Sequence, residues 1–483
     1  MSRRVQPEYA GKMQFSNNNR RNQRIPDFLR KLDPYRGIAG LCSAQYRPVM
    51  KSKRIQPATG PLDATVSIPG SKSLTNRALA IAALADGTTT LSEALYSDDT
   101  ELMIACLQVL GIRVETDIEG CRIVVHGCGG NIPASDGELF CGNSGTTIRF
   151  CTALCTLGKG HYTLDGNDRM RQRPIADLVG ALRSTGAVIG YEGTDGFPPV
   201  TVRGGGMRGS KITMLAPPSS QYVSAILMAA PYASGDIFLE IKETISAPYL
   251  SMTARMMESF GVSVMSRISD STTRFVVPAP QRYVASDYVI EPDASNASYF
   301  LAAPAIVGGR ITVENLGTKS IQGDVRFVDV LEEMGCQVTR EANKTTVRGP
   351  EAPACLKGID IDLNDMPDTA QTLAVVAMFA DGPTLIRNVG SLRVKETDRL
   401  SALSNELKKL GAGVYTTEDS IEITPPQAFK PASIHTYDDH RMAMSFALAG
   451  LRIDGVAIED PTCVNKTFPD FFDRFEAMYE SRA

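Results

Sequence analysis

The sequence lacks tryptophan and contains only four histidines. Its ten cysteines form no CxxC pair, and the histidines complete no zinc-ligand spacing, so the sequence predicts no metal site. No apolar run approaches the ~20 residues that a membrane-spanning helix needs; the runs at 300–307 and 373–380 are each eight residues long. These absences exclude a zinc protein, a disulfide scaffold and a membrane-spanning protein, and they favour reduced, core-like thiols.

Acidic residues are scarce in the first 54 positions, which hold thirteen Lys and Arg but only three Asp and Glu. The rest of the chain holds 37 basic and 51 acidic residues, which argues against a nucleic-acid partner. Because residues 1–54 show little apolar periodicity, we predict a basic, poorly ordered extension. We predict a cytoplasmic location, with an organelle as the alternative if this extension is a targeting peptide.

Glycines recur with a fixed period along the rest of the 483 residues, which are enough for two to four domains. One series has spacings of 73, 75, 74, 73 and 73 residues: Gly87, Gly160, Gly235, Gly309, Gly382 and Gly455. A second series has spacings of 75, 75, 74 and 76: Gly111, Gly186, Gly261, Gly335 and Gly411. This periodicity predicts six related units of about 74 residues, which are too small to be stable alone and should share cores.

Each unit reads as strand, apolar helix, glycine turn, strand, amphipathic helix and two alternating strands, which makes it an α/β unit. The apolar helices, such as 369–380, are apolar nearly all round and should be buried on every side. A capping sequence precedes each of them, at residues 69–73, 142–146, 217–221, 292–295, 366–369 and 437–441. Ordinary capping explains any single one, but six helix N-termini with cationic residues beside them indicate a site for anions.

Six motifs resemble those of the 5-enolpyruvylshikimate-3-phosphate synthase family, the 3-phosphoshikimate 1-carboxyvinyltransferases among the enolpyruvyl transferases. They are the segments 69–77, 142–149, 169–174, 393–399, 439–444 and 466–470, in the order of that family. The resemblance begins near residue 55 and runs to the end of the chain. It implies transfer of the enolpyruvyl group of phosphoenolpyruvate to the 5-hydroxyl of shikimate 3-phosphate, releasing phosphate, in the shikimate pathway of aromatic amino acid biosynthesis.

The resemblance also implies a fold of two globular domains, each built from three βαβαββ units as an inside-out α/β barrel. Residues 71–289 would form one domain, and residues 55–70 with 290–483 the other. The two domains close on the substrates. No metal and no organic cofactor take part, and we expect a monomer whose partners are the two small substrates.

Site roles follow from the same resemblance. The predicted contacts of shikimate 3-phosphate are Lys72, Ser73, Arg77, Ser219, Ser220, Gln221, Ser246, Tyr249, Asp368 and Lys395. The predicted phosphoenolpyruvate site consists of Lys72, Asn143, Gly145, Arg169, Gln221, Arg399, Arg441 and Lys466. The predicted catalytic residues are Asp368 and Glu396 as the proton-transfer pair, supported by Lys72 and His440.

Three positions depart from the family pattern: Ser144 stands where alanine is common, Phe150 where proline is usual, and Ser391 where an asparagine often contacts substrate. Gly145 is intact, and in this family the missing side chain leaves room for the inhibitor glyphosate, so we expect sensitivity.

Two other readings stay open. The first is UDP-N-acetylglucosamine enolpyruvyl transferase, which shares the sixfold architecture. That family uses a cysteine in a loop that here, at residues 159–173, contains none. The second is a non-catalytic anion-binding relative, which should have lost Asp368, Glu396 or Lys72, and all three are present.

Overall fold

A computed structural model describes residues 51–243, 246–269, 272–351 and 355–480. Within them, the predicted six repeats of an α/β unit are confirmed. The predicted basic extension, residues 1–54, falls almost wholly outside the described residues. Its last part differs from the expectation, because Ser52–Arg54 form strand β1 and pair with β23 (Ala457–Glu459).

The first three units each contain four strands and two helices. Unit one consists of β2 (Leu62–Val66), α2 (Lys72–Leu84), β3 (Asp86–Ser92), α3 (Asp98–Val109), β4 (Arg113–Asp117) and β5 (Arg122–Cys128). Unit two consists of β6 (Asp136–Phe140), α4 (Gly145–Leu157), β7 (His161–Asp165), α5 (Ala176–Ser184), β8 (Val188–Tyr191) and β9 (Val200–Arg203). Unit three consists of β10 (Ser210–Leu215), α6 (Ser220–Ala229), β11 (Ile237–Lys242), α7 (Ala247–Ser259), β12 (Met265–Ile268) and β13 (Thr272–Val277).

The last three units follow the same order, and the sixth ends after its second helix. Unit four consists of β14 (Tyr288–Val289), α8 (Ala294–Val307), β15 (Gly309–Glu314), α9 (Phe327–Glu333), β16 (Gln337–Arg340) and β17 (Lys344–Arg348). Unit five consists of β18 (Asp360–Asp362), α10 (Ala370–Ala377), β19 (Thr384–Arg387), α11 (Arg399–Lys409), β20 (Gly413–Thr416) and β21 (Ile421–Thr424). Unit six consists of β22 (Ser433–Ile434), α12 (His440–Gly450), β23 and α13 (Phe471–Glu480). Short 3₁₀ helices join these elements at η1 (Met170–Gln172), η2 (Ala230–Tyr232), η3 (Gly323–Arg326), η4 (Pro367–Thr369), η5 (Gly390–Val394) and η6 (Pro461–Lys466).

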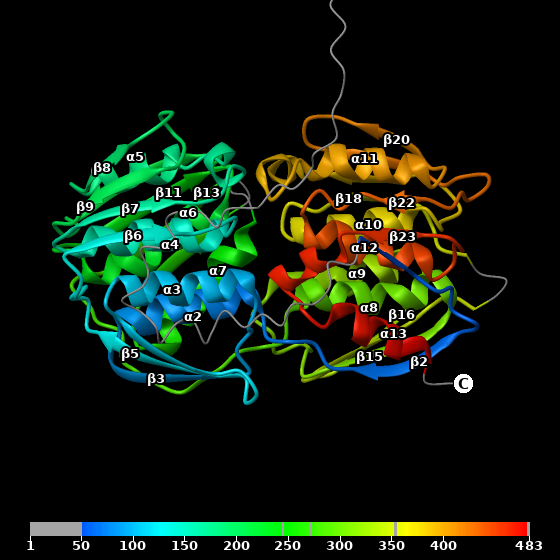
Figure 1. Ribbon diagram of the computed structural model, residues 1–483, viewed down its shortest axis with the longest axis horizontal. Coiled ribbons are helices and arrows are strands. Elements are labelled where there is room, and N and C mark those ends of the chain that lie inside the picture. Colours follow the sequence, from blue (N-terminus) through cyan, green and yellow to red (C-terminus); the bar gives the residue numbers. More distant parts are fainter. Residues whose placement is uncertain (1–50, 244–245, 270–271, 352–354, 481–483) are drawn as a thin grey trace, which may run out of the picture. The chain divides into compact units, whose positions relative to one another are not determined.

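Units one and four exchange their first strands. Strand β2 pairs in parallel with β15 of unit four, and in Figure 1 the blue β2 lies beside β15. In return, β14 pairs in parallel with β3 of unit one. Among the described residues, the sixth sheet consists of β22, β23 and β1, and β1 pairs antiparallel with β23 as β13 does with β11 in unit three.

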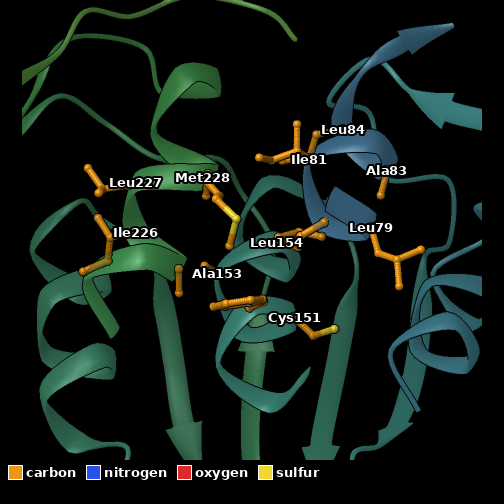
Figure 2. Close-up of a cluster of buried hydrophobic side chains, with 14 of the residues drawn as sticks. Leu79, Ile81, Ala83, Leu84, Cys151, Ala153, Leu154, Ile226, Leu227 and Met228 are labelled. Carbon is orange, nitrogen blue, oxygen red and sulfur yellow. The ribbon is translucent and has the colours of Figure 1, made fainter. Parts of the chain in front are cut away.

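The first helix of each unit lies inside a core, as its all-round apolar pattern predicts. Figure 2 shows buried side chains of α2, α4 and α6, and those of Ile81, Leu154 and Met228 lie between the three helices. One core draws on residues from 74 to 290, and a second draws on residues 55–68 and 294–478. The strands alternate buried and half-exposed residues, as in β17, because the sheets cover these helices on one face and meet solvent on the other.

Candidate active site

A polar pocket lies where residues of both cores meet. It is lined by residues from units one, two, three, five and six, so its lining comes from five of the six units. Its lining consists of Lys72, Ser73, Arg77, Asp99, Gly145, Thr146, Arg173, Ser219, Ser220, Gln221, Ser246, Tyr249, Pro367, Asp368, Lys395, Glu396, Arg399 and Arg441.

Five of the six buried helices reach this pocket with residues at or beside their N-termini. The residues concerned are Lys72 of α2, Gly145 of α4, Ser220 of α6, Asp368 before α10 and Arg441 of α12. The sixth helix, α8, takes part indirectly, since its N-cap Asp293 accepts a hydrogen bond from the backbone N–H of Lys72 at 3.1 Å. Free N–H groups and the partial positive charge of these helix N-termini favour anions in the space between them.

Cations outnumber carboxylates around the pocket. Six lining residues are Lys or Arg, and three are Asp or Glu. An excess of fixed positive charge in a buried setting is costly unless anions occupy the site. The pocket is therefore built for ligands that carry negative charge.

Arg399 is the centre of the charge network and is only 1% exposed. Its Nε lies 2.7 Å from Asp439 Oδ2, its Nη1 lies 3.2 Å from Asp368 Oδ1, and its Nη2 lies 2.8 Å from Glu396 Oε2. Burial alone would lower the pKa of Arg399, but these three carboxylates raise it, so the guanidinium stays charged. Arg399 thereby fixes the distance between Asp368 and Glu396.

The two carboxylates predicted as the proton-transfer pair are both held ionised. Burial alone would raise the pKa of Asp368, but Arg441 at 3.0 Å and Lys395 at 3.5 Å, together with Arg399, lower it far below its ordinary value. Burial would likewise raise the pKa of Glu396, and the surrounding cations, led by Arg399, lower it well below its ordinary value. Both groups can accept a proton only when the charge around them changes, as it does when anionic ligands enter.

His440 lies fully buried at the start of α12 and does not line the pocket. Desolvation, together with the nearby charges of Arg441 and Lys72, lowers the pKa of its imidazole well below 6.5. Among the described residues, neither ring nitrogen of His440 has a hydrogen-bond partner. It is therefore a neutral ring beside the carboxylate network.

Arg77 also lines the pocket, and its guanidinium is held by other protein groups. It donates to Thr253 Oγ1 at 2.8 Å, to the carbonyl of Ser73 at 2.9 Å and to Ser224 Oγ at 3.2 Å. Its guanidinium lies 5.5 Å from the ring centre of Phe150, one of the family departures. Burial lowers the pKa of Arg77 to about 10, so it remains cationic at neutral pH.

Tyr249 connects this part of the pocket to the second core. Its hydroxyl donates to Asp324 Oδ2 at 3.0 Å, and Ser295 Oγ also donates to that oxygen. Burial, and then the charge of Asp368, raise the pKa of Asp324 to about 6.

Gly145 stands at a point where a side chain would collide. A Cβ atom there would lie 2.6 Å from Arg173 Nη2 and 3.0 Å from Arg149 Nη1. The adjacent family departure, Ser144, is the N-cap of α4, and its Oγ accepts a hydrogen bond from the N–H of Thr147 at 3.4 Å. The absence of a side chain at Gly145 thus keeps two arginines close to the floor of the pocket.

The structure brings most of the predicted site residues together. All ten predicted contacts of shikimate 3-phosphate line the pocket, and so do Glu396, Gly145, Arg399 and Arg441. Lys466 lies just outside the lining, with its Nζ 4.0 Å from Glu396 Oε1. The backbone carbonyl of Asn143 accepts from Lys466 Nζ at 2.9 Å and from Arg173 Nη1 at 3.0 Å, and its side-chain Oδ1 also accepts from Arg173 Nη1 at 3.2 Å.

Arg169 does not line the pocket. Its Nε donates to the carbonyl of Glu396 at 3.0 Å and its Nη2 to the carbonyl of Lys395 at 2.9 Å, so it holds the backbone of the neighbouring segment instead. Arg173, four residues further along the same motif, lines the pocket. Ser391, the third family departure, does not line it either.

Four lining residues were not among the predictions: Asp99, Thr146, Arg173 and Pro367. Thr146, Arg173 and Pro367 lie inside or beside predicted motifs, so their sequence neighbours could have indicated them. Asp99 lies in the first turn of α3, where an acidic residue is ordinary, and the sequence carries no signal that its side chain points to the pocket.

Comparison with known proteins decides the family. The family model described as EPSP synthase (3-phosphoshikimate 1-carboxyvinyltransferase) matches residues 57–475 of the chain. The chain belongs to the EPSP synthase family. A family member named 3-phosphoshikimate 1-carboxyvinyltransferase from Nostoc punctiforme is 49% identical over 421 residues, covering 87% of this chain and 97% of its own length.

Other EPSP synthases agree with this assignment. A relative from Arabidopsis thaliana named 3-phosphoshikimate 1-carboxyvinyltransferase, chloroplastic, is 50% identical over 427 residues, covering 86% of this chain and 82% of its own length. The solved structure of EPSP synthase from Acinetobacter baumannii superposes with a TM-score of 0.73 at 26% identity, covering 89% of this chain and 98% of that chain. Both the sequence and the fold therefore match EPSP synthases over nearly the whole described chain.

Two features are absent from the part of the chain that the structure describes. No helix there is long and apolar enough to cross a membrane. No group of three or more His, Cys, Asp or Glu side chains there is arranged to hold a metal ion.

Proposed function

We propose that the chain transfers the enolpyruvyl group of phosphoenolpyruvate to the 5-hydroxyl of shikimate 3-phosphate, giving 5-enolpyruvylshikimate 3-phosphate and phosphate. This is the step of aromatic amino acid biosynthesis for which the EPSP synthase family is named. The observation that carries the proposal is the pocket itself, in which two ionised carboxylates, Asp368 and Glu396, lie among six Lys and Arg residues.

Shikimate 3-phosphate is proposed to bind at the hydroxyl-rich part of the pocket. Ser73, Ser219 and Ser220 can donate to its phosphate, and Lys72 supplies charge there. The other proposed contacts are Arg77, Gln221, Ser246, Tyr249, Asp368 and Lys395. Arg77 acts mainly through its charge in this proposal, because its guanidinium donors already have protein partners.

Phosphoenolpyruvate is proposed to bind between the two cores. Lys72, Arg399 and Arg441 would offset the charge of its phosphate and carboxylate, with Gln221 and Gly145 beside them. Lys466 adjoins this group and is proposed to approach the substrate on binding. We keep Asn143 and Arg169 as supports of this subsite, because they contact Lys466 and the backbone of residues 395–396.

The chemistry requires two proton transfers in the addition step and two in the elimination step. Entry of the anionic substrates offsets the surrounding cations, so that one carboxylate of the Asp368 and Glu396 pair carries a proton and delivers it to the methylene carbon of phosphoenolpyruvate, while the other, ionised, takes the proton of the attacking hydroxyl. The resulting tetrahedral ketal then loses phosphate: the methyl group returns its proton to the first carboxylate, and the second carboxylate gives the former hydroxyl proton to the departing phosphate. Lys72 and the neutral His440 are proposed to support this pair by setting the electrostatic field around it.

We propose that residues 71–289 form one domain and residues 55–70 with 290–483 the other, and that anions draw the domains together. The division into two hydrophobic cores supports this, as do hydrogen bonds such as Lys466 Nζ to the carbonyl of Asn143. A monomer suffices for such a site, since one chain supplies every proposed contact. Light scattering of the purified protein tests this, and a dimer that dissociates with loss of activity would contradict it.

The cytoplasm remains the predicted location, and an organelle is the alternative to be tested. The alternative is supported by the basic first 54 residues and by the name of the Arabidopsis relative, which includes the word chloroplastic. Imaging the full chain with a C-terminal fluorescent tag, against a version that begins at Met50, distinguishes the two locations.

The activity is tested by mixing purified protein with phosphoenolpyruvate and one of two acceptors, and following phosphate release. Release with shikimate 3-phosphate alone is expected. Release only with UDP-N-acetylglucosamine would assign the chain to the related transferase, and no release with either would indicate a non-catalytic anion-binding protein.

A further inference from the structure

We infer that Asp99 is a positioning residue that holds Lys72 and Lys466 side by side, and so builds the phosphoenolpyruvate subsite from two parts of the chain. Its Oδ2 lies 3.2 Å from Lys72 Nζ, and its Oδ1 lies 3.1 Å from Lys466 Nζ. Each carboxylate oxygen thus takes one ammonium group. This inference rests on the proposed function, because it assigns the two lysines to that substrate.

Burial strengthens the interactions between Asp99 and the two lysines. The side chain of Asp99 is 3% exposed, and those of Lys72 and Lys466 are 12% and 11% exposed. Two ammonium groups brought together in a dry site repel each other strongly, because little water screens them. A carboxylate between them removes most of that repulsion, and each ammonium group keeps further N–H donors for an anion.

Asp99 also joins elements that belong to different cores. Lys72 is the first residue of α2 and Asp99 lies in the first turn of α3, both among residues of the first core, whereas Lys466 ends η6 among those of the second. The same ammonium of Lys466 donates to the carbonyl of Asn143 at 2.9 Å. Lys466 is therefore held against the first core by one carboxylate and one carbonyl, and Asp99 supplies the charged half of that contact.

A purely local role for Asp99 as a helix cap does not explain this geometry. Helix α3 already has a capping box, in which Ser97 and Thr100 satisfy each other's backbone groups. Glu101 and Asp98 also supply negative charge to the first turn of the helix. Both carboxylate oxygens of Asp99 face lysines.

The test replaces Asp99 by asparagine and measures kinetics for both substrates. The amide has nearly the same shape but presents N–H groups to one of the two lysines, so the lysines should separate. We expect the Asp99→Asn variant to raise the KM for phosphoenolpyruvate by about 10-fold to 100-fold, as for loss of one partner of a buried charge pair. The KM for shikimate 3-phosphate should rise less, because Asp99 is paired with one of its ten proposed contacts, Lys72, but with two of the proposed phosphoenolpyruvate contacts, Lys72 and Lys466.

Two further variants make the result specific. Asp99→Glu keeps the charge and should restore part of the loss, whereas Glu101→Gln removes an exposed carboxylate from the same helix turn and should change neither KM. A KM for phosphoenolpyruvate within about twofold of the wild type in Asp99→Asn would overturn the inference. So would an equal rise in both KM values, which would give Asp99 a general structural role.

A binding measurement separates this inference from the proposed function. Phosphoenolpyruvate should raise the thermal unfolding midpoint of the wild type and of Glu101→Gln more than that of Asp99→Asn. If the wild type shows this shift but no turnover, the proposed function fails while the role of Asp99 stands. If all three proteins shift equally, the role of Asp99 fails whatever the activity.

Discussion

At the scale of single residues, the pocket works by setting charge states. Desolvation alone would raise the pKa values of Asp368 and Glu396, yet the neighbouring arginines and lysines lower them and hold both groups ionised. The pKa of His440 is lowered, because burial and the nearby cations both oppose its protonation, so its ring stays neutral. The charge states of the proposed acid–base groups are therefore set by their surroundings.

Replacing Glu396 by glutamine tests the proton-transfer role. The amide keeps the shape and can still accept a hydrogen bond from Arg399, but it cannot exchange a proton at neutral pH. We expect turnover to fall by about 10²–10⁴ with little change in the KM values, the usual range for a general acid or base. Steady-state kinetics measures this, with the exposed Glu418→Gln as control, and near-wild-type turnover would remove Glu396 from the mechanism.

Gly145→Ala tests the space beside the arginines. The added methyl group would lie 2.6 Å from Arg173 Nη2, so the guanidinium has to move away from the pocket. We expect weaker inhibition by glyphosate and a higher KM for phosphoenolpyruvate. Inhibition assays should show no such change for Gly180→Ala, where nothing lies within 4 Å of the new Cβ atom. Equal glyphosate constants for wild type and Gly145→Ala would contradict this explanation.

Asp324 gives a pH-dependent prediction. Its pKa rises from 3.8 to about 6 on folding, so the folded protein binds its proton more tightly than the unfolded one. Its contribution to stability is therefore complete below about pH 4 and is lost as the pH rises through about 6. As the pH rises from 4 to 7, the free energy of unfolding of Asp324→Asn should therefore increase by about 3 kcal/mol relative to that of the wild type.

Urea denaturation at several pH values measures that gain. The comparison with Asp324→Asn cancels the contributions of titrating groups that do not interact with Asp324. Parallel stability curves for the two proteins would show that Asp324 does not have a raised pKa.

At the scale of secondary-structure elements, the repeat explains why so many functional residues share one pocket. Equivalent buried helices carry their N-termini to the same place, because each unit repeats the same strand, helix and turn. The exchange of β2 and β14 ties units one and four together, although their sequences lie more than two hundred residues apart. The site residues that gather there come from almost every part of the described chain.

Much of this arrangement could be predicted from local patterns, and some could not. The glycine spacing indicates six units, and the capping sequences indicate helix N-termini that favour anions. No local pattern indicates that β2 pairs with β15, because the partner of a strand depends on the whole fold. Arg169 and Arg173 share one motif, and only the carbonyl groups of residues 395 and 396 decide that Arg169 turns away from the pocket. The sequence likewise gives no sign that Asp99 lines the pocket, because the placement of its side chain depends on the whole fold.

The N-terminal strand gives a stability prediction for an element. Ile55 is fully buried directly after β1, and its N–H donates to the carbonyl of Val456 at 3.0 Å. Ile55→Ala should lower the free energy of unfolding by about 2–5 kcal/mol, as for other buried isoleucines. Chemical denaturation checks this against the exposed Lys51→Ala, and a change below about 0.5 kcal/mol would show that this segment is not part of the packed fold.

At the scale of the whole molecule, charge links binding to domain closure. Each proposed domain brings cations to the pocket, so the two should repel each other until anions lie between them. Small-angle scattering should therefore show a smaller radius of gyration when shikimate 3-phosphate and phosphoenolpyruvate are added together. An unchanged scattering profile would mean that anions do not draw the domains together.

One pocket is proposed to hold both acidic substrates against the helix N-termini, and every proposed residue role depends on this. A crystal structure of the Glu396→Gln variant with both substrates tests it directly, because slow turnover should trap them. We expect the phosphate of shikimate 3-phosphate beside Ser73, Ser219 and Ser220, and phosphoenolpyruvate beside Lys72, Arg399 and Arg441. Substrates bound on another surface, or a pocket left without either one, would contradict the account.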